Sequence, residues 1–264
     1  MALSAQPAIE PSLLLRRYFD SMLREYGPQR WWPARTRLEV ILGAILTQNT
    51  SWENAARAIK ELRRSGLLSL ARLRHAARAD LQALIRSAGF FRQKAVTICR
   101  FVDWLDKECN GSLAKMFSLP EEELRGQLLR IKGLGPETVD AILLYAGALP
   151  TFVADAYTRR ILGRHGLVRG GAGYEETRQF LHSHLPADAR LFNEYHALLV
   201  ETGKRHCRRA QPNCEGCPLE PFLPELGPKP DAASKDSNAD DIAGAQSMPE
   251  VGPRGGVRIA VNST

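Results

Sequence analysis

The chain has 264 residues, of which 44% are hydrophobic. This hydrophobic share excludes a disordered protein, and the length suffices for one large domain or two smaller lobes. The formal net charge is +7, and because the tail 226–264 has a charge of −1, residues 1–225 carry +8, which suits a polyanionic partner or a merely solvated Arg-rich surface. No apolar run reaches the about 18 residues that a membrane span needs, and the N-terminal segment lacks a secretory pattern, so we expect a cytoplasmic protein without membrane contact.

Apolar residues recur at every third or fourth position over residues 11–203, which is the period of amphipathic helices. Ser51 and Asp80 are suited to be N-caps, and Pro120 precedes three glutamates that favour the positive end of a helix dipole. No segment alternates in the manner of a strand. The pattern predicts an all-α protein of about ten short helices. The tail 226–264 has almost no large apolar residue and is predicted to be disordered.

A helical hairpin is predicted around Gly133-Leu134-Gly135, where a tight turn leads into a second helix that opens at Pro136. Glycines permit backbone conformations closed to other residues and let a phosphate approach the amides at a helix start. Lys132 adds a positive charge, and Leu134 is expected to pack into the hairpin core. The hairpin is therefore a candidate phosphate-binding element, although such turns also simply connect packed helices.

Asp155 lies 22 residues beyond Gly133, directly after the apolar run Phe152-Val153-Ala154. An aspartate before a new helical segment is a common N-cap, because its side chain accepts hydrogen bonds from the first free amides. A carboxylate at this place is also a candidate catalytic group. The two interpretations are compatible.

The hairpin followed by this aspartate resembles the signature of the endonuclease III superfamily of helix-hairpin-helix DNA glycosylases. The resemblance extends over about residues 35–222. Within the superfamily the chain is most similar to the group that includes bacterial 3-methyladenine DNA glycosylases, on the evidence of the segments 31–33, 43–50 and 140–146.

This resemblance implies two α-helical lobes with an active cleft between them. Residues 36–148 would form a six-helix barrel that ends in the hairpin. Residues 1–35 and 149–225 would together form the second lobe, which includes a cysteine loop. Asp155 would then face the cleft opposite the hairpin, in the role of catalytic carboxylate.

Cleavage of an N-glycosidic bond passes through an oxocarbenium-like sugar, which a nearby carboxylate stabilises while it positions water. Bifunctional members of the superfamily carry a lysine nucleophile at the start of the second hairpin helix. The matching residue here is Glu137, and a carboxylate cannot form an imine. The resemblance therefore implies a glycosylase without lyase activity.

An extruded base needs aromatic faces to replace the stacking that it loses, and Trp31, Trp32 and Trp52 match the positions at which relatives hold the base. For any one of them, filling the core is the competing explanation. Gln48 matches an amide that relatives insert into the gap left by the flipped nucleotide, although it could simply end a helix. The predicted DNA-contacting set is Gln48, Lys132, Gly133, Leu134, Gly135, Thr138 and Arg159.

Cys207, Cys214 and Cys217 reproduce the first three ligands of the iron-sulfur loop of the superfamily, with six and two residues between them. The fourth ligand position is Leu223. A [4Fe-4S] cluster with a non-cysteine fourth ligand, a zinc site that uses His206, and a metal-free loop held by packing are the three interpretations.

The leading hypothesis is a monomeric DNA glycosylase that acts on an alkylated purine in double-stranded DNA. One alternative is a glycosylase for oxidised or deaminated pyrimidines, with or without lyase activity. The other is a non-catalytic binder that uses the hairpin to hold DNA. A pure binder has no need of Asp155, whereas the three tryptophans distinguish the two enzymes only weakly.

Overall fold

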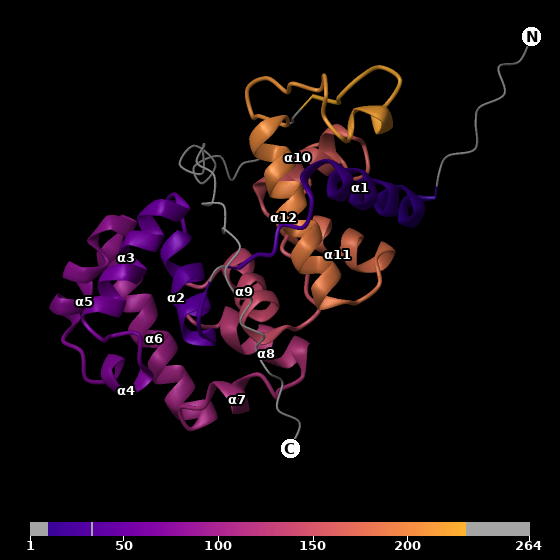
Figure 1. The fold of residues 1–264 in the computed structure, drawn as a ribbon. Helices are drawn as coiled ribbons and strands as arrows, with labels where there is room; N and C mark the ends of the chain where they lie inside the picture. Colours follow the sequence, from indigo (N-terminus) through magenta and orange to yellow (C-terminus); the bar gives the residue numbers. More distant parts are fainter. Residues whose placement is uncertain (1–9, 33, 231–264) are drawn as a thin grey trace, which may run out of the picture.

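The computed structural model describes residues 10–32 and 34–230, and this part of the chain consists of helices and loops without a strand (Figure 1). The helices before the hairpin are α1 (Pro11–Tyr26), α2 (Arg37–Thr47), α3 (Trp52–Arg64), α4 (Leu70–Leu73), α5 (Arg78–Leu84), η1 (Arg86–Ala88), α6 (Phe91–Cys109) and α7 (Leu113–Met116). The remaining helices are α8 (Glu121–Leu129), α9 (Pro136–Ala141), η2 (Ile142–Ala146), α10 (Ala156–Arg164), α11 (Tyr174–His184), α12 (Ala189–Arg205) and η3 (Glu220–Phe222). The predicted all-α class is confirmed.

The helix starts follow ordinary capping chemistry, with one difference from the prediction. The Ser51 hydroxyl accepts a 3.3 Å hydrogen bond from the Asn54 amide and caps α3 as expected. The prediction that Asp80 is an N-cap is wrong, because Ala77 occupies that place in α5. Asp80 lies in the first helical turn instead, where its charge still interacts favourably with the helix dipole.

The N-terminal helix α1 packs against the penultimate helix α12, which also contacts α10 (Figure 1). At the other end of the molecule α2 packs against α3, α6 and η2. The hairpin helices α8 and α9 lie between these two groups, and η2 contacts α12. Helices far apart in sequence thus meet near the hairpin. The lobe boundaries at residues 35 and 148 stay a prediction.

Helix α2 is the central element of the core, since every residue from Leu38 to Leu46 is buried. A helix that is apolar all round must be surrounded by other helices, and α2 is in contact with four of them. Its direction is therefore set by packing on every side. As a consequence, Gln48 at its C-terminal end has a well-defined position beside the hairpin.

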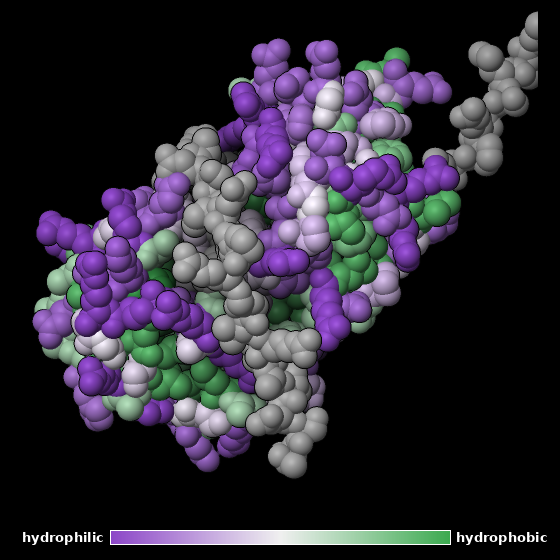
Figure 2. Space-filling view, in the orientation of Figure 1, coloured by the Kyte–Doolittle hydropathy of each residue, from purple (hydrophilic) through white to green (hydrophobic). Residues whose placement is uncertain are grey.

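Hydrophilic side chains are spread over both ends of the face shown in Figure 2, with smaller hydrophobic patches between them. No helix in residues 10–32 and 34–230 has both the length and the apolar character for crossing a membrane. Residues 226–230 follow the body of the protein, and the Lys229 amide donates a 2.8 Å hydrogen bond to the Arg164 carbonyl. The rest of the predicted tail lies outside the described residues.

Candidate active site

The hairpin turn joins α8 to α9 and depends on glycine at position 133. Gly133 has a φ of +108°, and a Cβ atom there would lie 2.1 Å from the Thr97 hydroxyl. Leu134 is buried as predicted, whereas Lys132 and Gly135 are exposed. The turn therefore presents backbone amides and a lysine to solvent while its leucine anchors it in the core.

Gln48 connects the end of α2 to this hairpin. Its side-chain amide donates hydrogen bonds to the Gly133 carbonyl at 3.0 Å and to the Thr138 hydroxyl at 2.8 Å. Thr138 is buried, so its side chain braces the hairpin from within. The structure thus brings three of the predicted DNA-contacting residues together through two hydrogen bonds.

Asp155 caps α10, and it is almost completely buried. Its Oδ1 atom accepts a 2.8 Å hydrogen bond from the Thr158 amide, so the expected N-cap is present. Burial favours the neutral acid and would raise the pKa of Asp155, but hydrogen bonding and charge from His196, together with the Thr158 amide, hold it below its ordinary value. Asp155 is therefore an ionised carboxylate near neutral pH. Arg159, in the next turn, is half-buried.

His196 of α12 is the neighbour of Asp155 that the sequence analysis missed. Its Nε2 atom lies 3.5 Å from Asp155 Oδ2, and its Nδ1 atom is hydrogen-bonded to the Tyr145 hydroxyl. Tyr145 comes from η2, 51 residues away in sequence. A single histidine on a largely apolar helix carries no motif, so no sequence signal marked it.

The three predicted tryptophans are linked to His196 and Tyr145 by a chain of ring contacts. Trp31 meets the His196 ring edge-on, with 5.7 Å between ring centroids. Trp32 is 5.0 Å from Trp52 and 5.1 Å from Tyr145. We call Trp31, Trp32 and Trp52 the tryptophan cluster. All three are only partly buried, so aromatic surface remains available beside the candidate catalytic carboxylate.

Lys204 is a second functional candidate that sequence reasoning missed. It lies on α12 two turns beyond His196, with its Nζ atom 5.8 Å from the centroid of the Trp31 ring. Burial lowers the pKa of Lys204, while the charges of three acidic neighbours oppose this change. One of these neighbours is Asp155. A cation therefore accompanies the carboxylate in the tryptophan cluster.

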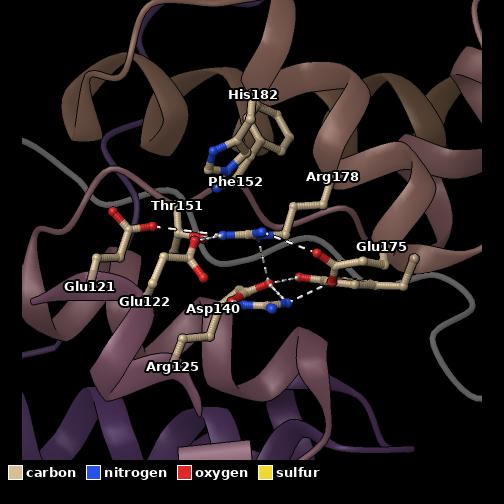
Figure 3. A network of polar contacts seen from close by, with 10 residues as sticks. Glu121, Glu122, Arg125, Asp140, Thr151, Phe152, Glu175, Arg178 and His182 are labelled. Atoms are coloured by element: carbon tan, nitrogen blue, oxygen red, sulfur yellow. Dashed lines mark hydrogen bonds and ion pairs between the residues drawn. The ribbon is translucent and has the colours of Figure 1, made fainter.

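A buried ionic network supports the loop that leads to Asp155 (Figure 3). Asp140 accepts hydrogen bonds from Arg125 at 2.7 Å and from the Tyr174 hydroxyl at 2.8 Å, and Arg178 lies 3.4 Å away. Arg178 also donates to the Thr151 hydroxyl, at the start of the buried loop. The network thereby links the hairpin helices to α11 and to the segment before Asp155.

The backbone of this loop has its own partner on α11. The Phe152 amide donates a 2.9 Å hydrogen bond to the Nε2 atom of His182. Residues Thr151 to Asp155 are all buried. Because side chains of α11 hold the loop at two successive residues, the approach of the chain to Asp155 is closely constrained.

Cys207, Cys214 and Cys217 line one small cavity with His206 and Leu223. The Cys207 carbonyl and sulfur are held by arginines of α10, with 3.3 Å from the Arg164 Nη1 atom to the sulfur. Burial raises the pKa of Cys217 to about 11. Among the described residues, no three His, Cys, Asp or Glu side chains form a group that could hold one metal ion. Leu223 brings no donor atom to the cavity.

Comparison with known proteins agrees with this architecture. Residues 42–187 match a family described as "HhH-GPD superfamily base excision DNA repair protein". The chain is 40% identical over 211 residues to a protein of Methanocaldococcus jannaschii whose name proposes a DNA repair glycosylase, a match that covers 79% of this chain and 95% of that protein. It is 32% identical over 181 residues to endonuclease III of Thermotoga maritima, covering 69% and 79% of the two chains.

Solved structures show the same fold. A trapped endonuclease III–DNA covalent intermediate has a TM-score of 0.68 at 21% identity, and the match covers 80% of this chain and 94% of that chain. The 3-methyladenine DNA glycosylase MagIII of H. pylori bound to 1,N6-ethenoadenine has a TM-score of 0.64 at 25% identity, covering 75% and 98%. This chain therefore belongs to the HhH-GPD superfamily of base excision DNA repair proteins, as a DNA glycosylase of the endonuclease III family.

Proposed function

We propose that the chain hydrolyses the N-glycosidic bond of an alkylated purine flipped out of double-stranded DNA, and that it acts as a monomer in the cytoplasm. The observation that carries this proposal is the ionised, buried carboxylate of Asp155 beside the tryptophan cluster. Positive charge develops on the sugar as the bond to the base breaks, and a fixed carboxylate in a site of low polarity stabilises that charge strongly. Water then adds to the sugar from the side of Asp155.

The tryptophan cluster supports a purine as the lesion. A flipped base stacks on aromatic faces, and a purine offers the larger area to Trp31, Trp32 and Trp52. Alkylation that places a positive charge on the ring adds an attraction to electron-rich indoles. The similarity to the H. pylori enzyme, which is named for 3-methyladenine and was solved with an ethenoadenine, points to the same class.

The absence of lyase activity is proposed from Glu137. This residue is exposed in the first turn of α9, where the resemblance places the lysine nucleophile of bifunctional enzymes. A carboxylate forms no imine with the ring-opened sugar. We expect no covalent adduct when the protein is treated with borohydride on an abasic duplex. A trapped adduct that disappears in Lys132→Ala or in Lys204→Ala would contradict this part of the proposal and name the nucleophile.

The grip on DNA is proposed to come from the hairpin turn and its neighbours. The exposed amides at Gly133 and Gly135 and the charge of Lys132 suit a phosphate. The Lys94 ammonium binds the carbonyls of Leu46 and Ala88, which links the start of α6 to the end of α2. Phe90, directly before α6, is 57% exposed, and an exposed aromatic side chain is suited to stack on a base.

A [4Fe-4S] cluster held by Cys207, Cys214 and Cys217 is proposed as the cofactor. Three thiols line one cavity, and arginines of α10 approach the Cys207 sulfur and carbonyl, which favours an anionic group there. Because residue 223 is leucine, the fourth iron of such a cluster would need a ligand that is not cysteine. Visible absorbance together with iron and sulfide analysis of anaerobically purified protein tests this, and zinc in place of iron would support the alternative with His206.

A base-release assay tests the function directly. Duplexes that contain a methylated purine, an oxidised pyrimidine or uracil are incubated with the parent protein and with Asp155→Asn. Release of only the methylated purine, abolished in the variant, is the expected result. Preferential release of the pyrimidines would replace the proposed substrate by the one that the endonuclease III relatives suggest. Tight duplex binding without release of any base would indicate a non-catalytic DNA binder.

A further inference from the structure

His196 lies beside the carboxylate oxygen of Asp155 that does not cap α10. One oxygen, Oδ1, accepts the Thr158 amide hydrogen, and the other, Oδ2, faces His196 Nε2 at 3.5 Å. The side chains of His196 and Asp155 are 7% and 13% exposed. One carboxylate oxygen is therefore hydrogen-bonded to the protein and the other lies beside an imidazole, in a place that little water reaches. Each oxygen still has a second lone-pair direction for the sugar or for water.

The Tyr145 hydroxyl fixes the orientation of the His196 ring. Burial, together with the negative charges of Asp155 and Glu194, raises the pKa of Tyr145 well above its usual range, so its oxygen stays protonated. The hydroxyl is hydrogen-bonded to Nδ1 of His196, and this contact orients the ring. The other ring nitrogen, Nε2, then lies 3.5 Å from Asp155 Oδ2. One histidine thus contacts both Tyr145 and Asp155.

We propose that Tyr145 and His196 form a relay that holds Asp155 ionised and oriented toward the sugar, with His196 as a positioning residue for the glycosidic cleavage. This inference rests on the proposed function, because it concerns the same carboxylate. The relay itself transfers no proton in the reaction. It places the Nε2 atom of His196 beside Asp155 Oδ2, which favours the charged form of the carboxyl group over the neutral form.

Other charges also face the relay, and they come from several elements. Glu194 of α12 accepts hydrogen bonds from the Gln29 and Arg30 amides, which fixes its carboxylate. Lys204, also on α12, experiences the charges of Asp155 and of Glu53 from α3. From α10, the Thr158 amide completes the set. The cation of Lys204 acts in the same direction as His196, so removing His196 weakens the support for the charged carboxylate without abolishing it.

The expected signature is a change in pH dependence. Because the ionised form of Asp155 is the active one, activity is lost as the pH falls through the pKa of this carboxyl group. His196 lowers that pKa, so its removal moves the acidic limb of the kcat profile to higher pH. A residue that served only to fill space would leave the acidic limb where it is.

The test compares His196→Leu, His196→Gln and Tyr145→Phe in steady-state base release across a pH series. We expect His196→Leu to lower kcat on the order of tenfold to a hundredfold, with little change in KM, and to shift the acidic limb upward. His196→Gln keeps an amide donor near Asp155 and should recover part of both effects. Tyr145→Phe should show a smaller shift, because it removes only the hydrogen bond that orients the imidazole.

Control variants separate this inference from other causes. His75 is exposed beyond α4, and His75→Leu should leave both the rate and the profile unchanged. Thermal unfolding of each variant reports whether it is folded. If Asp155→Asn is inactive while folded His196→Leu keeps the parent profile, the relay is wrong and the proposed function stands. If Asp155→Asn remains active, the proposed function is wrong, and the inference about His196 is wrong with it.

Discussion

Gln48 donates a 2.8 Å hydrogen bond to the hydroxyl of Thr138, which ties the end of α2 to the first turns of α9. The second donor hydrogen of the same amide reaches the Gly133 carbonyl. In this state the amide is fully used as a donor within the protein. Entry of Gln48 into a DNA gap therefore requires both hydrogen bonds to break.

This arrangement predicts different consequences for two substitutions. Thr138→Val removes one of the two hydrogen bonds that Gln48 donates, whereas Gln48→Ala removes both of them and also the group proposed to enter the duplex. We expect Gln48→Ala to lower kcat/KM on lesion DNA more strongly, by about tenfold beyond Thr138→Val, since an amide can pair with the orphaned base. Equal effects in steady-state measurements would limit Gln48 to bracing the hairpin.

Two substitutions of Asp155 are predicted to affect stability differently while both abolish catalysis. Asparagine caps helices about as well as aspartate, so Asp155→Asn should keep the unfolding free energy close to that of the parent. Asp155→Ala loses the hydrogen bond to the Thr158 amide and should cost about 1 kcal/mol. Both should lose base release by about 10²-fold or more. Urea unfolding beside the release assay checks this, and an active, stable Asp155→Ala would contradict both roles of the carboxylate.

Local patterns in the sequence predicted the hairpin turn and the N-cap at Asp155, both of which the structure contains, and the resemblance to relatives singled out the three tryptophans. They did not reveal His196, Tyr145 or the network around Asp140. These contacts join residues 15 to 51 positions apart, and only the packing of α8, α11 and α12 decides which polar side chains meet. The prediction that Asp80 caps a helix was wrong for a local reason. Several residues near a helix start can cap it, and the backbone geometry selects one.

The network around Asp140 is predicted to be a major source of stability. Asp140 is completely buried, and replacing it by alanine leaves the guanidinium groups of Arg125 and Arg178 without their shared carboxylate. Breaking a buried pair of this kind costs about 3–5 kcal/mol. The exposed pair Arg169–Glu176 is a matched control, and Glu176→Ala should cost less than about 1 kcal/mol. Similar costs for the two variants in urea unfolding would show that the network is energetically neutral.

Acidification is predicted to destabilise the fold through His165 and His182. Burial lowers the pKa of both histidines to about 4. His165 is hydrogen-bonded to the Tyr18 hydroxyl, and His182 accepts a hydrogen bond from the Phe152 amide. In the unfolded chain both histidines have a pKa of about 6.5, so below that pH they are protonated in the unfolded chain but still neutral in the folded one. The unfolding free energy should therefore fall between about pH 6.5 and pH 4, and the fall should be smaller in His182→Gln. A flat profile over this interval would contradict the prediction.

The cysteine cavity leads to a gain-of-function prediction. Leu223 lines the same cavity as Cys207, Cys214 and Cys217 and occupies the position of the missing fourth ligand. Leu223→Cys would supply a thiolate to the iron that lacks one, and a cluster with four protein ligands should lose iron more slowly to a chelator. The measurement is the decay of visible absorbance in the parent, in Leu223→Cys and in Leu223→Ser under the same chelator. Slower decay only in the cysteine variant supports the proposed cluster. Identical decay in all three would mean that residue 223 does not face the iron, and no visible absorbance in any of them would exclude the cluster.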